Sequence, residues 1–124
     1  MTLLAENDSA VSNFSGNRSI LSGSLLKVEI YSEAGTLIVD LVLKLLYSQE
    51  HPSFKLRFLN VKEYSFYHSS DHIFYNISNY KFFRIDEFFY LSLDPEDEKA
   101  SRSTNDSDFI LSKTVQAYSI SLSE

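Results

Sequence analysis

The chain has 124 residues, of which 44% are hydrophobic and 15% aromatic, and its formal net charge is −6. This length predicts one domain, 1–124, large enough to bury a hydrophobic core of its own. The absence of cysteine excludes a disulfide-framed secreted module and thiolate metal sites. The acidic balance argues against a direct nucleic-acid partner and favours a basic one.

The N-terminal region is polar and rich in Ser and Asn. We expect residues 1–13 to be frayed or to form one short helix, with Phe14 docked on a sheet. This region lacks the basic lead and the apolar run of a signal peptide, and charges interrupt every later apolar segment well short of a membrane span. We therefore expect a soluble, cytoplasmic protein without a membrane partner.

Residues 24–47 predict the first hairpin of a sheet. In the second arm, alternate positions share one wholly apolar face, formed by Leu37, Val39, Leu41, Leu43 and Leu45. In the first arm, apolar and polar residues also alternate. Between the arms, Ala34 and Gly35 supply a glycine that can take a positive φ in a tight turn.

The rest of the chain predicts more strands. After a break at 48–52, residues 53–59 alternate as a half-buried antiparallel strand does, and we expect 61–67 to be its partner. The aromatic-rich stretch 71–93 predicts two or three short strands, with 81–85 and 87–93 on either side of Asp86; 73–77 could be a strand or a helical turn. Residues 109–111 and 114–122 predict a final strand pair.

About seven to nine strands and no long helix predict an all-β fold, an antiparallel sandwich or a flattened barrel. The expected core consists of the apolar residues that alternate along these strands: Leu26, Val28, Ile30, Val39, Leu41, Leu43, Leu56, Phe58, Ile120 and Leu122.

Residues 94–108 carry six carboxylates against Lys99 and Arg102. They predict a solvated acidic loop whose field could steer a basic partner, or one charged only for solubility. The partner-binding residues that we predict are these carboxylates and two tyrosines that could anchor a desolvated centre: Asp94, Glu96, Asp97, Glu98, Asp106, Asp108, Tyr75 and Tyr80.

No motif in the chain requires a particular reaction. His68 and His72 are four residues apart, but in a strand that spacing separates two side chains too far to chelate one metal ion. The chain contains neither the G-x-S-x-G nucleophile elbow nor a phosphate-binding glycine loop. We therefore expect no enzyme, no cofactor and no metal.

Three segments carry a resemblance to a known group: LLKVEIYSEAGTLIVDLVL, FKLRFLNVKEYSFY and DFILSKTVQAYSISL. Their order resembles that of small bacterial immunity proteins of polymorphic-toxin and contact-dependent growth-inhibition systems. The resemblance implies a β-rich inhibitor that occludes the active site of a cognate toxin, often a basic nuclease, and it carries no site residues with it. The alternative is a lipocalin-like or fatty-acid-binding-like barrel whose aromatic residues enclose a small apolar molecule.

Overall fold

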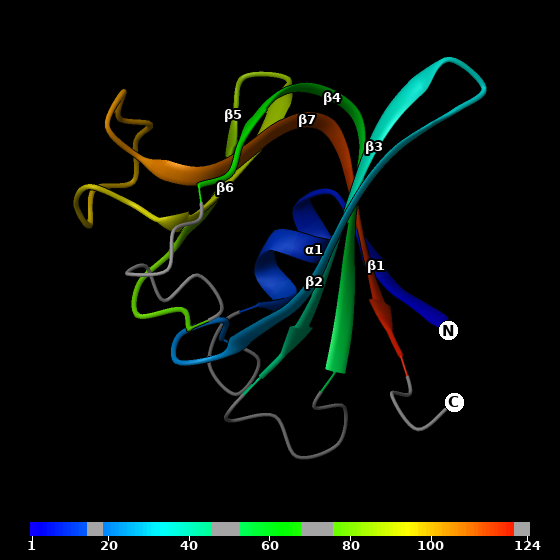
Figure 1. Cartoon of the computed structure of the whole chain (residues 1–124), viewed down its shortest axis with the longest axis horizontal. Helices are drawn as coiled ribbons and strands as arrows, with labels where there is room; N and C mark the ends of the chain where they lie inside the picture. The colour runs from blue at the N-terminus through cyan, green and yellow to red at the C-terminus, as the bar shows by residue number, and fades with distance from the viewer. Residues whose placement is uncertain (15–18, 46–52, 68–75, 121–124) are drawn as a thin grey trace.

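The computed structural model describes residues 1–14, 19–45, 53–67 and 76–120 (Figure 1). They form seven strands and one short helix: β1 (Thr2–Glu6), α1 (Asp8–Asn13), β2 (Ser24–Glu33), β3 (Thr36–Lys44), β4 (Ser53–Ser65), β5 (Lys81–Ile85), β6 (Phe88–Asp94) and β7 (Ser107–Ser119).

All seven strands belong to one antiparallel sheet of order β2-β3-β4-β7-β6-β5, and β1 pairs with the C-terminal part of β7. The predicted all-β, antiparallel fold is therefore confirmed. The sheet is open along this path, with β2 and β5 as its outer strands. α1 contacts β1, β5 and β7.

The sheet bends back over itself, which is how one sheet encloses a core. Phe82 of β5 lies with its ring centroid 6.5 Å from that of Phe58 on β4, although β5 is three places away along the sheet. The bend coincides with left-handed backbone at Asn60 (φ 54°) and with a shift of register between Val61 and Glu63 in β4, opposite Ser112 and Leu111 of β7. Such irregularities increase the local twist and turn a strand.

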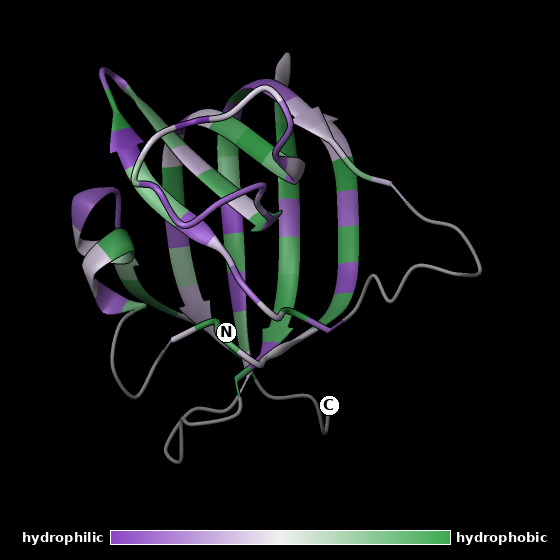
Figure 2. Ribbon diagram, turned by 90° about the vertical axis from the view of Figure 1, so that its left-hand side faces the viewer, coloured by the Kyte–Doolittle hydropathy of each residue, from purple (hydrophilic) through white to green (hydrophobic). Residues whose placement is uncertain are grey.

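The core lies on the inner side of this bend. Side chains there are fully buried, among them Leu41 and Leu43 of β3 and Leu56 and Phe58 of β4. Figure 2 shows hydrophobic and hydrophilic residues alternating along the strands, as a sheet with one covered face requires. Phe14 is also buried, edge-on to Phe54 at 5.4 Å between ring centroids.

The predicted hairpin is confirmed as β2 and β3, closed by a two-residue turn at Ala34 and Gly35 (φ 52° and 78°) between the paired residues Glu33 and Thr36. Two expected core residues in β2 are wrong, because Leu26 is 47% and Ile30 is 43% exposed. A bulge between Leu25 and Lys27 shifts the register and buries Leu25 in place of Leu26.

Five of the remaining core predictions are confirmed, because the side chains are fully buried: Val39, Leu41, Leu43, Leu56 and Phe58. Val28 and Ile120 are half-buried, and Leu122 lies outside the described residues.

Several predicted boundaries are also wrong. The segments 53–59 and 61–67 are not partners, because β4 runs continuously from Ser53 to Ser65 and pairs with β3 and β7. Likewise, β7 is one strand where we expected a pair. The N-terminal region does contain a short helix, but it also contains β1, which composition did not indicate. The expected break at 48–52 and most of 73–77 fall outside the described residues.

Candidate functional site

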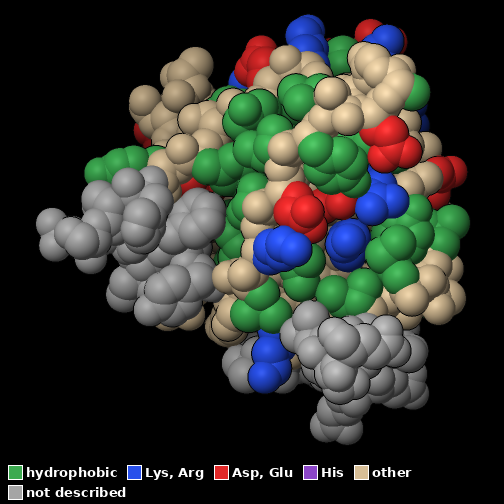
Figure 3. Space-filling view, turned by 45° about the vertical axis from the view of Figure 1, so that its right-hand side comes forward, with side chains coloured by type: hydrophobic (Ala, Val, Ile, Leu, Met, Phe, Trp, Pro, Cys, Tyr) green, Lys and Arg blue, Asp and Glu red, His purple; other side chains and the backbone are tan. Residues whose placement is uncertain are grey.

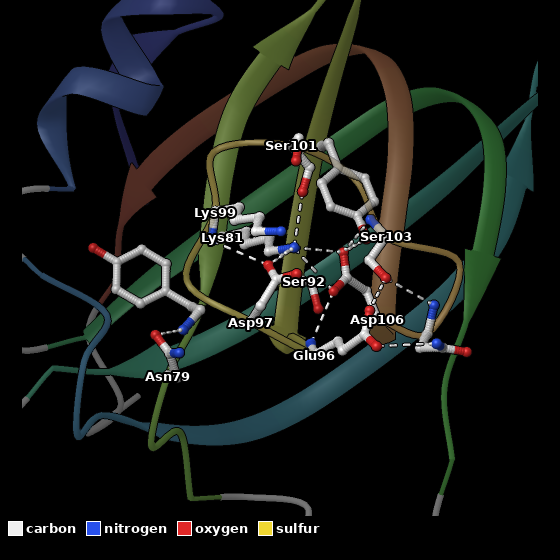
Figure 4. A network of polar contacts seen from close by, with 12 residues as sticks. Asn79, Lys81, Ser92, Glu96, Asp97, Lys99, Ser101, Ser103 and Asp106 are labelled. Atoms are coloured by element: carbon white, nitrogen blue, oxygen red, sulfur yellow. Dashed lines mark hydrogen bonds and ion pairs between the residues drawn. The ribbon is translucent and has the colours of Figure 1, made fainter.

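The acidic segment connects β6 to β7 and is folded around one buried carboxylate, that of Asp106 (Figure 4). This side chain accepts hydrogen bonds from the Tyr90 hydroxyl at 2.7 Å and from the backbone N–H groups of Glu96 and Ser103, both at 2.9 Å. These bonds tie both ends of the loop to the same point. The loop consequently has a defined shape, although its composition is typical of an unstructured one.

The opposite charge comes from Lys81, the first residue of β5, whose side chain is only 3% exposed. Its Nζ lies 3.1 Å from Asp106 Oδ1 and 2.9 Å from Asp97 Oδ1, and it donates to the carbonyl oxygen of Ser101 at 2.8 Å. One buried ammonium group is thus shared by two carboxylates and a carbonyl, which satisfies its three donors.

Proton affinities follow from these contacts. Burial would raise the pKa of Asp106, but hydrogen bonds from Ser103, Tyr90, Glu96 and Lys81 outweigh it and hold the pKa at about 2. Burial would lower the pKa of Lys81, yet its bonds to Asp97 and Asp106 raise this pKa. Both groups therefore keep their charges at neutral pH, and the ion pair is intact there.

The six predicted carboxylates do not share one environment. Asp94, Glu96 and Glu98 are exposed, and Asp97 is partly exposed. Asp106 and Asp108 are buried, and Asp108 accepts a hydrogen bond from the backbone N–H of Tyr67 at 2.8 Å. The four exposed or partly exposed carboxylates can face a partner. Asp106 instead holds the loop in place, and Asp108 holds the start of β7.

The two predicted tyrosines also differ. Tyr75 lies outside the described residues. Tyr80 is half-buried, and its hydroxyl lies 3.1 Å from the Phe14 carbonyl oxygen and 3.2 Å from the Ser19 hydroxyl. With Glu98 and Lys99, Tyr80 lines a shallow depression of about 270 Å³ between β5 and the loop. The structure therefore places Tyr80 beside one of the exposed carboxylates.

Exposed Glu96 is held within the loop. One of its carboxylate oxygens accepts from the Ser103 hydroxyl and the other from the Asn105 side-chain amide at 3.0 Å. These bonds, led by that from Ser103, lower the pKa of Glu96. The pKa of Asp97 is lowered chiefly by its hydrogen bond with Lys81. Both side chains remain anionic at neutral pH.

A second polar centre, which the sequence analysis missed, surrounds Asp40 in the middle of β3. This carboxylate is 2% exposed and faces away from the core. It accepts two hydrogen bonds from Arg57 of β4, at 3.0 and 3.1 Å, and one from the Tyr31 hydroxyl of β2 at 2.8 Å. Lys55 Nζ lies 3.9 Å away. Acidic and basic side chains gather in the middle of this outer face, with hydrophobic ones around them (Figure 3).

The Asp40 centre is a ladder of pairs across neighbouring strands. Asp40 stands opposite Arg57 in the register, and the Arg57 guanidinium carbon lies 5.5 Å from the centroid of the Tyr118 ring. The hydrogen bond with Asp40 is the main reason why the pKa of Arg57 is raised. A lone acid in an apolar strand, followed by a strand with alternating Lys and Arg, is the sequence signal that could have revealed this centre.

Two further features considered in the sequence are a metal site and a cavity for a small apolar molecule. Among the residues that the structure describes, no three His, Cys, Asp or Glu side chains gather where they could hold a metal ion, and His51, His68 and His72 fall outside this part. The aromatic rings Phe14, Phe54, Phe58 and Phe82 pack on one another in the core. An aromatic-lined cavity for an apolar molecule stays a prediction.

Across the described part of the chain, no helix combines the length and the apolar character needed to cross a membrane. Comparisons of the chain with protein-family models, with curated proteins and with solved structures find no match.

Proposed function

We propose that this chain is an immunity-type inhibitor, which binds a cognate basic toxin domain through the surface formed by Asp94, the 95–106 loop and Tyr80. The observation that carries the proposal is the buried Lys81–Asp106 pair, which fixes a loop with exposed carboxylates next to a depression lined by Tyr80. This surface offers a basic partner a negative electrostatic field and a depression that can hold one side chain.

The physical advantage of such a loop is its fixed shape. A disordered acidic segment loses conformational entropy when it binds, whereas a loop already tied at Asp106 loses less. An enzyme that cuts nucleic acid presents Lys, Arg or protonated His to phosphates, so carboxylates suit an inhibitor that covers its cleft. In this proposal Asp94, Glu96 and Glu98 meet the cations of the toxin, while Asp106 and Asp108 support the loop.

The test needs a basic toxin domain, and the first candidate to look for is the C-terminal domain of a large secreted protein encoded next to this chain. Asp94→Asn combined with Glu98→Gln removes two exposed charges without touching the Lys81–Asp106 pair. The matched control, Glu33→Gln with Glu87→Gln, removes two exposed charges elsewhere. We expect the loop variant to associate several-fold more slowly than the control at low salt, with the difference shrinking at high salt.

Two results would count against the proposal. If the unmodified protein neither binds this domain nor protects its substrate, the inhibitor function fails. If it binds, but the loop variant and the control associate at the same rate at every salt concentration, the loop is not the interface.

A further inference from the structure

The outer edge of β2 has no neighbouring strand over residues 25–33 in the described part of the chain; Ser24 alone makes an isolated bridge, with Asn76. Free edges expose backbone N–H and C=O groups that can pair with another chain. Large apolar side chains are also exposed on this strand, with Leu26 at 47% and Ile30 at 43%. Among the described residues this edge is thus without a paired strand, and it is partly apolar.

The sequence of this edge is complementary to itself. If two copies run antiparallel with Val28 opposite Val28, then Lys27 of each copy stands opposite Glu29 of the other. Opposite charges at facing positions stabilise antiparallel strands. Both side chains are available, because Lys27 is 60% and Glu29 is 43% exposed, and within one copy they already pair at 3.1 Å. The same arrangement brings Leu26 opposite Ile30 at each end of the paired segment.

The backbone hydrogen-bonding groups of β2 are compatible with the same two-fold arrangement. The two-residue turn makes Glu33 and Thr36 a hydrogen-bonded pair, and such pairs alternate with non-hydrogen-bonded ones along an antiparallel ladder. Glu29 is therefore bonded to β3, and the N–H and C=O of Val28 point outward. A two-fold axis at Val28 lets each copy donate from its Val28 N–H to the Val28 carbonyl of the other.

We infer that two copies of this chain associate through β2, antiparallel and with Val28 on the two-fold axis, so that their sheets become continuous. The bulge between Leu25 and Lys27 ends the regular ladder, which limits the pairing to residues 26–30 of each copy. The 95–106 loop lies on the other side of the molecule from the tip of the β2–β3 hairpin (Figure 1).

Single-cysteine variants test the register, because the natural chain contains no cysteine. In the proposed dimer the two Val28 Cα atoms lie about 5.5 Å apart, a separation that a disulfide can span. Val28→Cys should therefore form a disulfide-linked dimer under mild oxidation. Ser32→Cys is the matched control, since its two copies would be eight positions apart, roughly 27 Å. Equal cross-linking of both variants, or none of Val28→Cys, would overturn the register.

Charge reversal tests the pairing without altering the core side of the strand. Lys27→Glu places like charges opposite each other at two positions, and we expect the dimer dissociation constant, measured by sedimentation, to rise about ten-fold or more. Adding Glu29→Lys restores opposite charges and should restore the native constant, whereas the exposed control Lys113→Glu should leave it unchanged. A monomeric native protein, or a double variant as weak as the single one, would refute the association.

Discussion

At the scale of single residues, the buried Lys81–Asp106 pair decides the shape of the acidic loop. Taking two charges out of water is costly unless each finds its hydrogen bonds, and here every buried side-chain nitrogen or oxygen in the described residues has a partner. Removing one member would leave the other charged and without its main counterion. The pair therefore makes the loop dependent on two particular side chains.

The pKa of Asp106 predicts how stability changes with acid. Its folded-state pKa of about 2 lies below the usual value of 3.8 for Asp, so its stabilisation is present above about pH 4 and is lost as the pH falls toward 2. We expect Asp106→Asn to destabilise the protein by about 3 kcal/mol at pH 7, because it leaves Lys81 less well paired. The difference from the native protein should shrink by about 2 kcal/mol between pH 5 and pH 2.

Denaturant unfolding at several pH values measures this difference. Glu87→Gln, at an exposed turn position, serves as the control and should differ from the native protein by the same amount throughout. A constant gap between Asp106→Asn and the native protein from pH 5 to pH 2 would show that Asp106 contributes no acid dependence.

At the scale of elements, the β2–β3 hairpin is closed by a two-residue turn, and only one of its two residues, Gly35, is well suited to the backbone conformation there. Both turn residues have positive φ, 52° at Ala34 and 78° at Gly35, as a type I′ turn requires. Glycine adopts this backbone without strain, but alanine carries a Cβ that opposes it. Ala34 is therefore a position at which the native residue costs stability.

Replacing Ala34 with Asn should stabilise the protein by about 0.5–1 kcal/mol, because Asn tolerates the left-handed region and Asn-Gly is the favoured pair in this turn. The midpoint of urea unfolding measures the change. Ala100→Asn, in the exposed loop and without a positive φ, should have little effect. If Ala34→Asn lowered the midpoint, the turn would have to differ from type I′.

At the scale of the whole molecule, one bent sheet must cover its own inner face. The face that begins at Leu37 and continues through Leu41 is apolar along its length, yet Leu37 is 36% exposed and Leu41 is fully buried. The difference arises because the hairpin tip extends past the part of the sheet that folds over it (Figure 1). Position under the bend, rather than residue type, determines burial here.

Paired substitutions on this face test that view. Leu41→Asp places a carboxylate without a counterion in the core and should cost several kcal/mol, enough to unfold a domain of ordinary stability. Leu37→Asp, on the same face of the same strand, should leave the protein folded and cost less than about 1 kcal/mol. Circular dichroism and thermal unfolding distinguish the two; a folded Leu41→Asp variant would mean that the core is wrongly placed.

Local periodicity was enough to predict the all-β class, the β2–β3 hairpin with its turn at Ala34 and Gly35, and the connection between β6 and β7 as an acidic loop. These features depend on neighbours within a few residues, since alternation and turn preferences act over that range. The strand pair β5 and β6 on either side of Asp86 was predicted for the same reason.

Burial and pairing between distant segments were decided by the tertiary structure alone. The bulge beside Leu26, the continuity of β4 and β7, and the Asp40–Arg57 pair all depend on which strands become neighbours. Lys81 and Asp106 look like solvated charges in the sequence, yet they lie 3.1 Å apart in the interior. Their burial is possible only because the folded chain supplies each with the other, and no short window of sequence contains both.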